Sequence, residues 1–316
     1  MWMDVVGIET PCVDLLANIP KIPEANRGTR LQNYSWQGGG KVSSAMVAAA
    51  RLGARCGMIG VVDGGTYGKF CLDDFKDHGI DVSRMIIDED GETPFSIVLA
   101  DDETHGRSII YYPGTNRPLE ISDLDKDYIQ SASYLHLATD SPVAKQAAIW
   151  AREKGRTVVY DADSYYPGIE DMIPLIDVFI ASEFFYEALF KDENYEANCK
   201  KIQEMGPDIV VFTLGEKGCV GVQGNEFFME EGFSVEVMDT TGAGDVYHGA
   251  FIAGLLQGWD ARRTARFSNA VSAIKCTRMG GRAAIPTFDT VMKFLETGII
   301  DYEEIDQRVA RYRRRI

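Results

Sequence analysis

The sequence predicts an α/β protein built around a mainly parallel β-sheet, and two observations carry this prediction. Short continuous apolar runs alternate with segments of helical spacing along most of the 316 residues. Continuous apolar runs are typical of parallel strands that helices bury on both faces. No Pro- or Ser-rich linker and no internal repeat interrupts the pattern. We therefore expect one large domain over residues 1–316 rather than a modular array.

The expected core elements follow one another along the chain. Six apolar runs predict strands at residues 5–8, 56–62, 134–137, 157–160, 178–180 and 209–213. Apolar residues at helical spacing predict helices at residues 42–53, 66–78, 142–154, 183–190, 195–205, 243–257, 260–279 and 288–296. The residues after the last helix, 297–316, are expected to form a C-terminal extension.

Two stretches break this alternation. Residues 27–37 alternate between polar and apolar side chains, and residues 93–112 hold two similar runs joined by the polar segment 101–106, which is typical of a hairpin. Because both stretches follow core strands, we expect one small β-sheet, built from about 12–37 and 91–118, that projects over the sheet edge. Ligands of open α/β sheets bind at the carboxyl ends of the strands, where such a sheet would act as a lid.

Composition excludes several classes of protein. The chain is 45% hydrophobic and 25% charged with a formal net charge of −16, so it is globular and its surface repels nucleic acid and anionic lipid. The one dense basic run, Arg311 with 313–315, is interpreted as a solvated helix end. No apolar stretch spans a bilayer, and no secretory signal begins the sequence. Six scattered cysteines predict buried thiols in a reducing cytoplasm and do not support a zinc site.

The strongest local signal is a polar, glycine-rich turn at residues 239–245, Asp-Thr-Thr-Gly-Ala-Gly-Asp, which runs directly into an apolar helix. Small residues let a ligand approach the backbone, and the free N–H groups of the first helical turn suit a phosphate. Asp245 has two interpretations here. It is either a partner of the helix dipole or a base that deprotonates a hydroxyl attacking phosphorus. Three successive small residues before it favour the second.

This turn resembles the second signature of the PfkB carbohydrate kinase family, also called ribokinase-like, and the resemblance extends over roughly residues 3–296. Residues 37–45, Gln-Gly-Gly-Gly-Lys-Val-Ser-Ser-Ala, look like the first signature, and residues 213–218, Thr-Leu-Gly-Glu-Lys-Gly, look like the nucleotide loop. The three motifs come in the family's order. The resemblance implies a three-layer α/β/α core with a small β-sheet lid.

The resemblance also implies roles on the phosphate side. Asp245 would be the general base, and the N–H groups of Gly242, Ala243 and Gly244 would form the anion hole for the γ-phosphoryl group of ATP–Mg²⁺. The residues implied at the nucleotide and its metal are Ser182, Glu183 (indirectly to Mg²⁺), Thr213, Gly215, Gly218 and Asn269. Asp239 and Thr241 match a site for a monovalent cation such as K⁺ in some members, although plain turn hydrogen bonding would explain them equally well.

On the sugar side, the resemblance implies that Asp14 accepts hydrogen bonds from two hydroxyls. Gly39 and Gly40 would present backbone N–H groups, and Lys41 resembles the lysine of ribokinase-type members. Asp140 lies where ribokinases carry a substrate-side Glu. The alternatives are a surface turn for Asp14, a solvated helix-start lysine for Lys41, and helix capping for Asp140.

The sequence departs from the family pattern at three positions. Ser44 replaces an Asn that contacts the sugar, Ser182 replaces the Asn beside Glu183, and Asp140 is one methylene shorter than the expected Glu. These changes leave phosphoryl transfer in place and bear on which sugar is used.

The resulting hypothesis is an ATP-dependent sugar kinase that phosphorylates a primary hydroxyl, with a ribokinase-like substrate favoured. Fructose, a keto-deoxy sugar acid and a nucleoside remain alternatives, and acidic or phosphorylated sugars would call for a lid cation from Arg27, Arg30 or Arg107. A non-catalytic sugar binder on the same fold is a remote alternative. A dinucleotide-dependent dehydrogenase and a P-loop kinase are excluded because their glycine motifs are missing. Exposed lid aromatics predict a homodimer formed through the lid.

Overall fold

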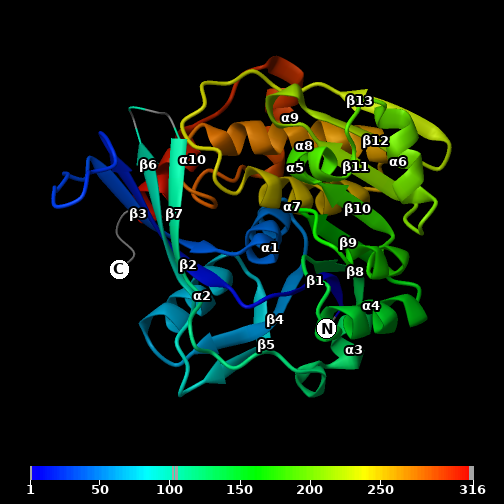
Figure 1. Cartoon of the computed structure of the whole chain (residues 1–316), viewed down its shortest axis with the longest axis horizontal. Coiled ribbons are helices and arrows are strands. Elements are labelled where there is room, and N and C mark those ends of the chain that lie inside the picture. The colour runs from blue at the N-terminus through cyan, green and yellow to red at the C-terminus, as the bar shows by residue number, and fades with distance from the viewer. Residues whose placement is uncertain (1, 102, 104–105, 313–316) are drawn as a thin grey trace.

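The computed structural model describes residues 2–101, 103 and 106–312. Its core is a nine-stranded sheet in the order β13-β12-β11-β10-β9-β8-β1-β4-β5 (Figure 1). The sheet is parallel from β11 to β5, whereas β12 and β13 are antiparallel to their neighbours. The strands are β1 (Met3–Ile8), β4 (Cys56–Asp63), β5 (Asp81–Asp88), β8 (Ala132–Leu137), β9 (Thr157–Ala162), β10 (Val178–Ala181), β11 (Ile209–Thr213), β12 (Cys219–Gln223) and β13 (Glu226–Glu230).

Helices cover both faces of this sheet and make a three-layer structure. One face carries α1 (Lys41–Arg51), α2 (Thr66–Asp77), α7 (Ala243–Leu256), α8 (Ala261–Cys276) and α9 (Phe288–Thr297). The other carries α3 (Lys126–Ser131), α4 (Pro142–Glu153), α5 (Glu183–Leu189) and α6 (Tyr195–Gln203). Successive strand residues serve the two cores in turn, as Val210 and Val211 do, because side chains alternate across a strand. Four short 3₁₀ turns lie at Ile121–Asp123, Ile169–Asp171, Ile173–Leu175 and Gly215–Lys217.

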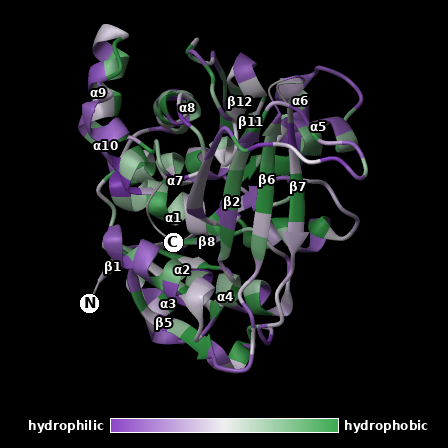
Figure 2. Cartoon of the chain, turned by 90° about the vertical axis from the view of Figure 1, so that its left-hand side faces the viewer, coloured by the Kyte–Doolittle hydropathy of each residue, from purple (hydrophilic) through white to green (hydrophobic). Residues whose placement is uncertain are grey.

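A separate four-stranded sheet forms the lid. It consists of β2 (Cys12–Ile19), β3 (Asn33–Gly39), β6 (Phe95–Asp101) and β7 (Gly106–Tyr112), in the order β3-β2-β6-β7. Figure 2 shows β2, β6 and β7 side by side, facing the viewer. The chain enters the lid from β1 and leaves it through β3, which leads directly into α1.

The predicted fold class, the six core strands, the eight helices and the lid sheet are confirmed. The expected strand at 27–37 begins later, at Asn33, and part of the polar connection 101–106 lies outside the described residues. The prediction lacked β2 as a strand, β5, β12, β13, α3 and α10 (Glu303–Tyr312). The strand β5 lies at the sheet edge with half-exposed or exposed residues, so it has no continuous apolar run.

The C-terminal extension is partly built into the core. Ile305, Arg308 and Tyr312 of α10 are buried, and only Arg311 of the predicted basic helix end is described, as an exposed residue. All six cysteines are free thiols, five of them buried. Among the described helices, none has the length and apolarity that crossing a membrane requires.

Candidate active site

The starts of two helices meet beneath the lid. In α7, Gly249 packs so tightly on α1 that an added Cβ would lie 2.0 Å from the carbonyl oxygen of Ala45. This backbone-to-backbone contact holds α7 against α1 (Figure 1). It therefore brings Asp245, in the first turn of α7, near Lys41, the first residue of α1, and the two side chains interact electrostatically.

The glycine-rich turn has the backbone geometry that an anion hole needs. Gly242 caps α7 with a φ of 72°, and an added Cβ would lie 3.0 Å from the Cα of Gly281, so a side chain is excluded twice. Within the described part of the chain, the N–H groups of Gly242 and Gly244 donate to no protein acceptor. The N–H of Ala243 donates to the carbonyl of Thr240 at 3.1 Å. Two of the three expected N–H groups are therefore available to a ligand.

Asp239 stabilises this turn through hydrogen bonds to the backbone. Its carboxylate accepts hydrogen bonds from the N–H groups of Thr241 and Gly280, both at 2.8 Å. The pKa of Asp239 is lowered: burial opposes this, but the Lys275 ammonium and the bonds from Thr241 outweigh burial. Lys275 donates to the carbonyl oxygens of both Asp239 (2.9 Å) and Thr241. The residues therefore do not fit the predicted potassium site, because a lysine ammonium already holds its carbonyl oxygens.

A group of carboxylates surrounds the start of α7. Burial raises the pKa of Asp245 well above its usual range, and the charges of Asp161 and Glu9 raise it further, while Lys41 opposes them. Asp161 stands at the carboxyl end of β9, and burial raises its pKa also. His248 Nε2 lies 3.4 Å from Asp161 Oδ1, and burial lowers the pKa of His248 to about 3, which keeps it neutral. Asp245 thus lies among other carboxylates, in surroundings that raise its pKa.

Asp14 lies on the lid face that covers this group. Its Oδ1 accepts a hydrogen bond of 2.5 Å from the Ser96 hydroxyl. An added Cβ on Gly39 would lie 2.3 Å from Asp14 Oδ2, so only glycine leaves room for the carboxylate. Lys41 Nζ pairs with Asp163 Oδ2 at 3.0 Å. Carboxylates and an ammonium arranged in this way can hold a polyol.

Glu9, which follows β1, caps α1. Its carboxylate accepts from the N–H groups of Lys41 (3.0 Å) and Ser43 (2.8 Å), which satisfies the first turn of the helix. Gly40 precedes that turn with a φ of 99°, a conformation that favours glycine. Glu9 therefore holds the start of α1, where the N–H groups of Lys41 and Ser43 are already hydrogen-bonded to protein.

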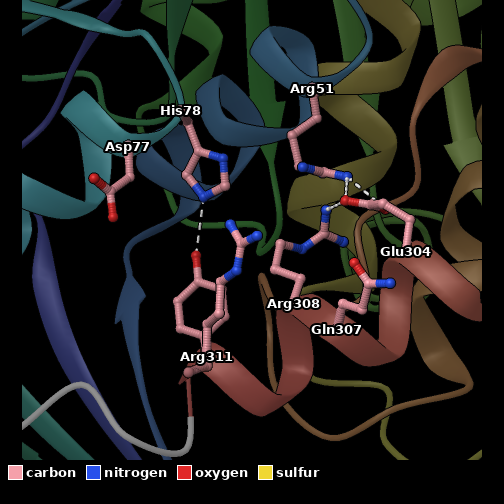
Figure 3. A pocket seen from close by; sticks show the side chains of 8 residues that line it. Arg51, Asp77, His78, Glu304, Gln307, Arg308 and Arg311 are labelled. Atoms are coloured by element: carbon pink, nitrogen blue, oxygen red, sulfur yellow. Dashed lines mark hydrogen bonds and ion pairs between the residues drawn. The ribbon is translucent and has the colours of Figure 1, made fainter.

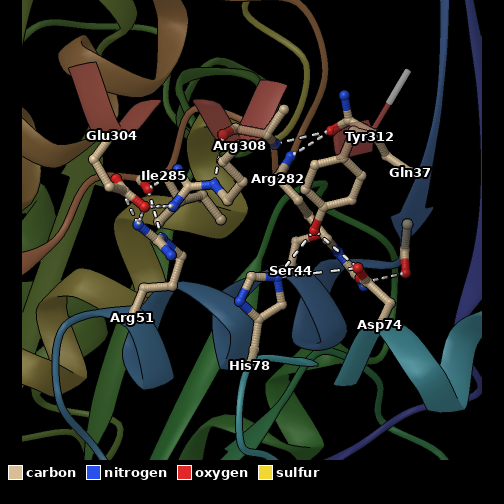
Figure 4. A network of polar contacts seen from close by, with 12 residues as sticks. Gln37, Ser44, Arg51, Asp74, His78, Arg282, Ile285, Glu304, Arg308 and Tyr312 are labelled. Carbon is tan, nitrogen blue, oxygen red and sulfur yellow. Dashed lines mark hydrogen bonds and ion pairs between the residues drawn. The ribbon is translucent and has the colours of Figure 1, made fainter. Parts of the chain in front are cut away.

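Ser44 contacts Arg282 rather than the cleft. The buried guanidinium of Arg282 donates to Ser44 Oγ (3.2 Å), to the carbonyl of Gly39 (2.7 Å) and to Asp74 (2.7 Å), as Figure 4 shows in part. Tyr312 of α10 also donates to Asp74, at 2.8 Å. This network holds the backbone of the first signature in place and connects it to the C-terminal helix α10.

The predicted nucleotide residues gather at the carboxyl ends of β10 and β11. Ser182 caps α5, and an added Cβ on Gly215 would lie 3.3 Å from Glu183 Oε1, which places the nucleotide loop beside Glu183. The Thr213 hydroxyl donates to the carbonyl of Ala181 at 3.4 Å. Gly218 has a φ of 96° and lies against the backbone of 230–232. Asn269 donates to the carbonyls of Glu230 and Glu231, both at 3.1 Å, and so supports the same wall of the site.

Asp140 is partly buried and does not cap α4, because Ser141 provides the cap by accepting from the N–H of Ala144 at 3.2 Å. The capping alternative for Asp140 is therefore wrong. A cavity of about 340 Å³ lies elsewhere, between α10 and the ends of α1 and α2 (Figure 3). Its arginines Arg51 and Arg308 are paired with Glu304, and it is lined by none of the predicted site residues.

Sequence reasoning missed five residues of this site. Glu9, Asp161 and Asp163 follow or end predicted strands, so their position at the carboxyl edge of the sheet was a usable signal. Lys275 and Arg282 gave no local signal, because each acts on a segment far away in the sequence.

Comparison with known proteins agrees with this architecture. The family model described as pfkB family carbohydrate kinase matches residues 4–288. A nucleoside kinase of Methanothermobacter thermautotrophicus is 25% identical over 303 residues, which cover 92% of this chain and 95% of the relative. An ATP-dependent ribose-1-phosphate kinase of Halopiger xanaduensis is 29% identical over 288 residues, which cover 89% and 94%.

Among solved structures, a ribokinase of Thermotoga maritima superimposes with a TM-score of 0.82 at 24% identity, over 94% of this chain and 100% of that chain. This likeness shows the fold, whereas the family model and the sequence relatives establish the family and the class of reaction. The chain belongs to the pfkB family of carbohydrate kinases and is a phosphotransferase.

Proposed function

We propose that this chain transfers the γ-phosphoryl group of ATP to a primary hydroxyl of a small ribosyl acceptor, with Asp245 as the general base. The observation that carries the proposal is the position of Asp245, one residue beyond the two free N–H groups of the anion turn. A carboxylate there removes the hydroxyl proton while the turn stabilises charge on the transferred group. A raised pKa makes it a stronger base than an exposed aspartate.

ATP–Mg²⁺ is the proposed donor. Among the described residues, the Glu183 carboxylate has no hydrogen-bond or ion-pair partner, and Gly215 lies beside it, so it is available to water around a metal. When bound, Mg²⁺ offsets the negative charge of the phosphates. Gly215 and Gly218, both at positive φ, let the nucleotide approach the backbone.

The acceptor is proposed from the Asp14 side of the site. Asp14 and Lys41 offer a carboxylate and an ammonium to vicinal hydroxyls, and Gly39 leaves space beside Asp14. Two of the sequence relatives are named a nucleoside kinase and a ribose-1-phosphate kinase, and both names refer to compounds with a ribosyl unit.

A phosphorylated or acidic acceptor is a second candidate because of Arg107. This residue of β7 donates to Thr240 Oγ1 at 3.0 Å and so brings a cation from the lid to the anion turn. Arg27 and Arg30, the other expected lid cations, are exposed in the loop before β3.

An acceptor panel tests this proposal. ADP release from ATP–Mg²⁺ should be highest with ribose, a nucleoside or ribose 1-phosphate and low with fructose and 2-keto-3-deoxygluconate. The Asp245→Asn variant, prepared in parallel, controls for contaminating kinases. Turnover confined to a keto-deoxy acid or to fructose would overturn the ribosyl assignment and leave the mechanism in place.

The pH dependence should follow the charges around Asp245. Because the base acts ionised, kcat/KM should fall as the pH drops through its raised pKa. Asp161→Asn removes a negative charge that raises this pKa, so the acid limb should move to lower pH. Lys41→Met removes the opposing positive charge, so the limb should move to higher pH. If the acid limbs of both variants stayed in place, or moved in the same direction, Asp245 would not be the base.

We also propose a homodimer formed through the lid. The β7 residues Ile109, Ile110 and Tyr111 are all more than half exposed. In the part of the chain that the structure describes, β7 pairs only with β6 and forms an edge of the lid sheet (Figure 2). Ile110→Glu, on the lid face away from Asp14, should convert a dimer to a monomer in sedimentation velocity. A wild-type chain that sediments as a monomer at micromolar concentration would refute the dimer.

A further inference from the structure

Lys275 is a buried lysine at the last turn of α8. Its side chain has no exposed surface, which is rare for lysine unless the ammonium is paired. The partners are the carbonyl oxygens of Asp239, at 2.9 Å, and of Thr241. The ammonium is therefore held by the backbone that leads into the anion turn at Gly242.

Hydrogen bonds to Asp239 hold the backbone segment that contacts the Lys275 ammonium. The Asp239 carboxylate accepts hydrogen bonds from the N–H groups of Thr241 and Gly280, so one aspartate binds the backbone of two separate parts of the chain. Its carbonyl oxygen, and that of Thr241, then face Lys275. A positive charge at this point attracts both carbonyl oxygens. Because the N–H of Gly242 points opposite to the carbonyl of Thr241 in the same peptide plane, this attraction directs that N–H away from Lys275.

We propose that Lys275 is a positioning residue that supplies, from within the chain, the charge of a monovalent cation at the carbonyls of Asp239 and Thr241, so that the anion turn keeps its shape without potassium. An ammonium and a potassium ion carry the same charge and both seek carbonyl oxygens. The two cannot share these oxygens, because like charges in contact repel strongly in a buried site. The functional half of this inference rests on the proposed role of the turn in phosphoryl transfer.

The first test uses the wild-type chain. ATP-dependent turnover is measured in buffer whose only monovalent cation is tetramethylammonium, with and without potassium chloride at constant ionic strength. We expect the rate to change by less than about fivefold, the low end of typical site-to-site coupling. Stimulation by potassium chloride of more than about fivefold, with no such effect of sodium chloride at the same ionic strength, would overturn the proposal.

The second test creates the missing site. Lys275→Met keeps an unbranched side chain that is one atom shorter and removes its charge. Without potassium, kcat should fall by about 10²-fold through misplacement of the turn, with a smaller change in KM, and potassium should restore part of it. Lys200→Met, at an exposed lysine of α6, is the matched control and should respond to neither treatment.

A third measurement does not depend on activity. Isothermal titration calorimetry and thermal unfolding with potassium chloride should show binding and stabilisation for Lys275→Met and none for the wild-type chain. Potassium binding to the wild-type chain, or failure of a folded Lys275→Met to bind potassium, would refute the inference even if the acceptor assignment were correct. If Lys275→Met does not fold, Lys275→Gln takes its place, and the wild-type titration remains decisive.

Discussion

Replacing Asp245 by Asn is expected to lower kcat by about 10²–10⁴-fold, the range of a lost general base. The amide keeps the shape of the side chain but cannot accept a proton, and it leaves the N–H groups of the turn in place. Affinities for ATP and for the acceptor should therefore remain near their wild-type values. Steady-state kinetics, combined with calorimetric titration of each substrate, measures the two effects separately.

The neighbouring helix provides a matched control for this substitution. Asp260 also stands at a helix start, where it caps α8 by accepting from the N–H of Arg263 at 2.7 Å. Asn caps a helix about as well as Asp, so Asp260→Asn should leave turnover unchanged. If Asp245→Asn behaved like Asp260→Asn, Asp245 would be a partner of the helix dipole and not a base.

Replacing Arg282 by Met is expected to cost about 3–5 kcal/mol of unfolding free energy, as breaking a buried ion pair does. Arg282 and Asp74 have fully buried side chains, 2.7 Å apart. The substitution would leave Asp74 charged in the interior (Figure 4). It would also remove the hydrogen bond to the carbonyl of Gly39. Urea unfolding followed by circular dichroism measures the loss.

Two further variants show whether the loss comes from the buried pair. Arg152→Met removes a half-exposed partner of Asp177 and should cost only about 0–1 kcal/mol. Combining Arg282→Met with Asp74→Leu should recover part of the stability, because no unpaired charge remains. A loss below about 1 kcal/mol for Arg282→Met alone would contradict the role given to this pair.

Local pattern was sufficient for most of the fold. The strands that were predicted, such as 209–213, are continuous apolar runs buried on both faces, and that pattern is visible in the sequence. The edge strands β5 and β13 carry exposed residues, so their apolar runs are broken, whereas β12 is buried but short and is interrupted by Gly221. The helix α10 is strongly charged, and its buried residues Arg308 and Tyr312 have partners only in the folded chain.

The residues of the candidate site also fall into those that the sequence predicts and those that it does not. The turn 239–245 and the first signature are contiguous segments, so their motifs could be found directly. Lys275 and Arg282 act on Thr241 and Gly39, which lie 34 and 243 residues away, and no spacing rule connects them. Ser44 illustrates the difference: its position in the motif implied a sugar contact, whereas its hydroxyl accepts from Arg282.

Phosphoryl transfer at the turn before α7 can be tested by following the γ-phosphate of labelled ATP. The wild-type chain, incubated with ATP–Mg²⁺ and ribose or another ribosyl acceptor, should move the label into a phosphomonoester on the primary hydroxyl, and Asp245→Asn should not. Label that stays in ATP with every acceptor, while a folded chain still binds sugar and nucleotide, would exclude phosphoryl transfer and leave a sugar-binding protein without kinase activity.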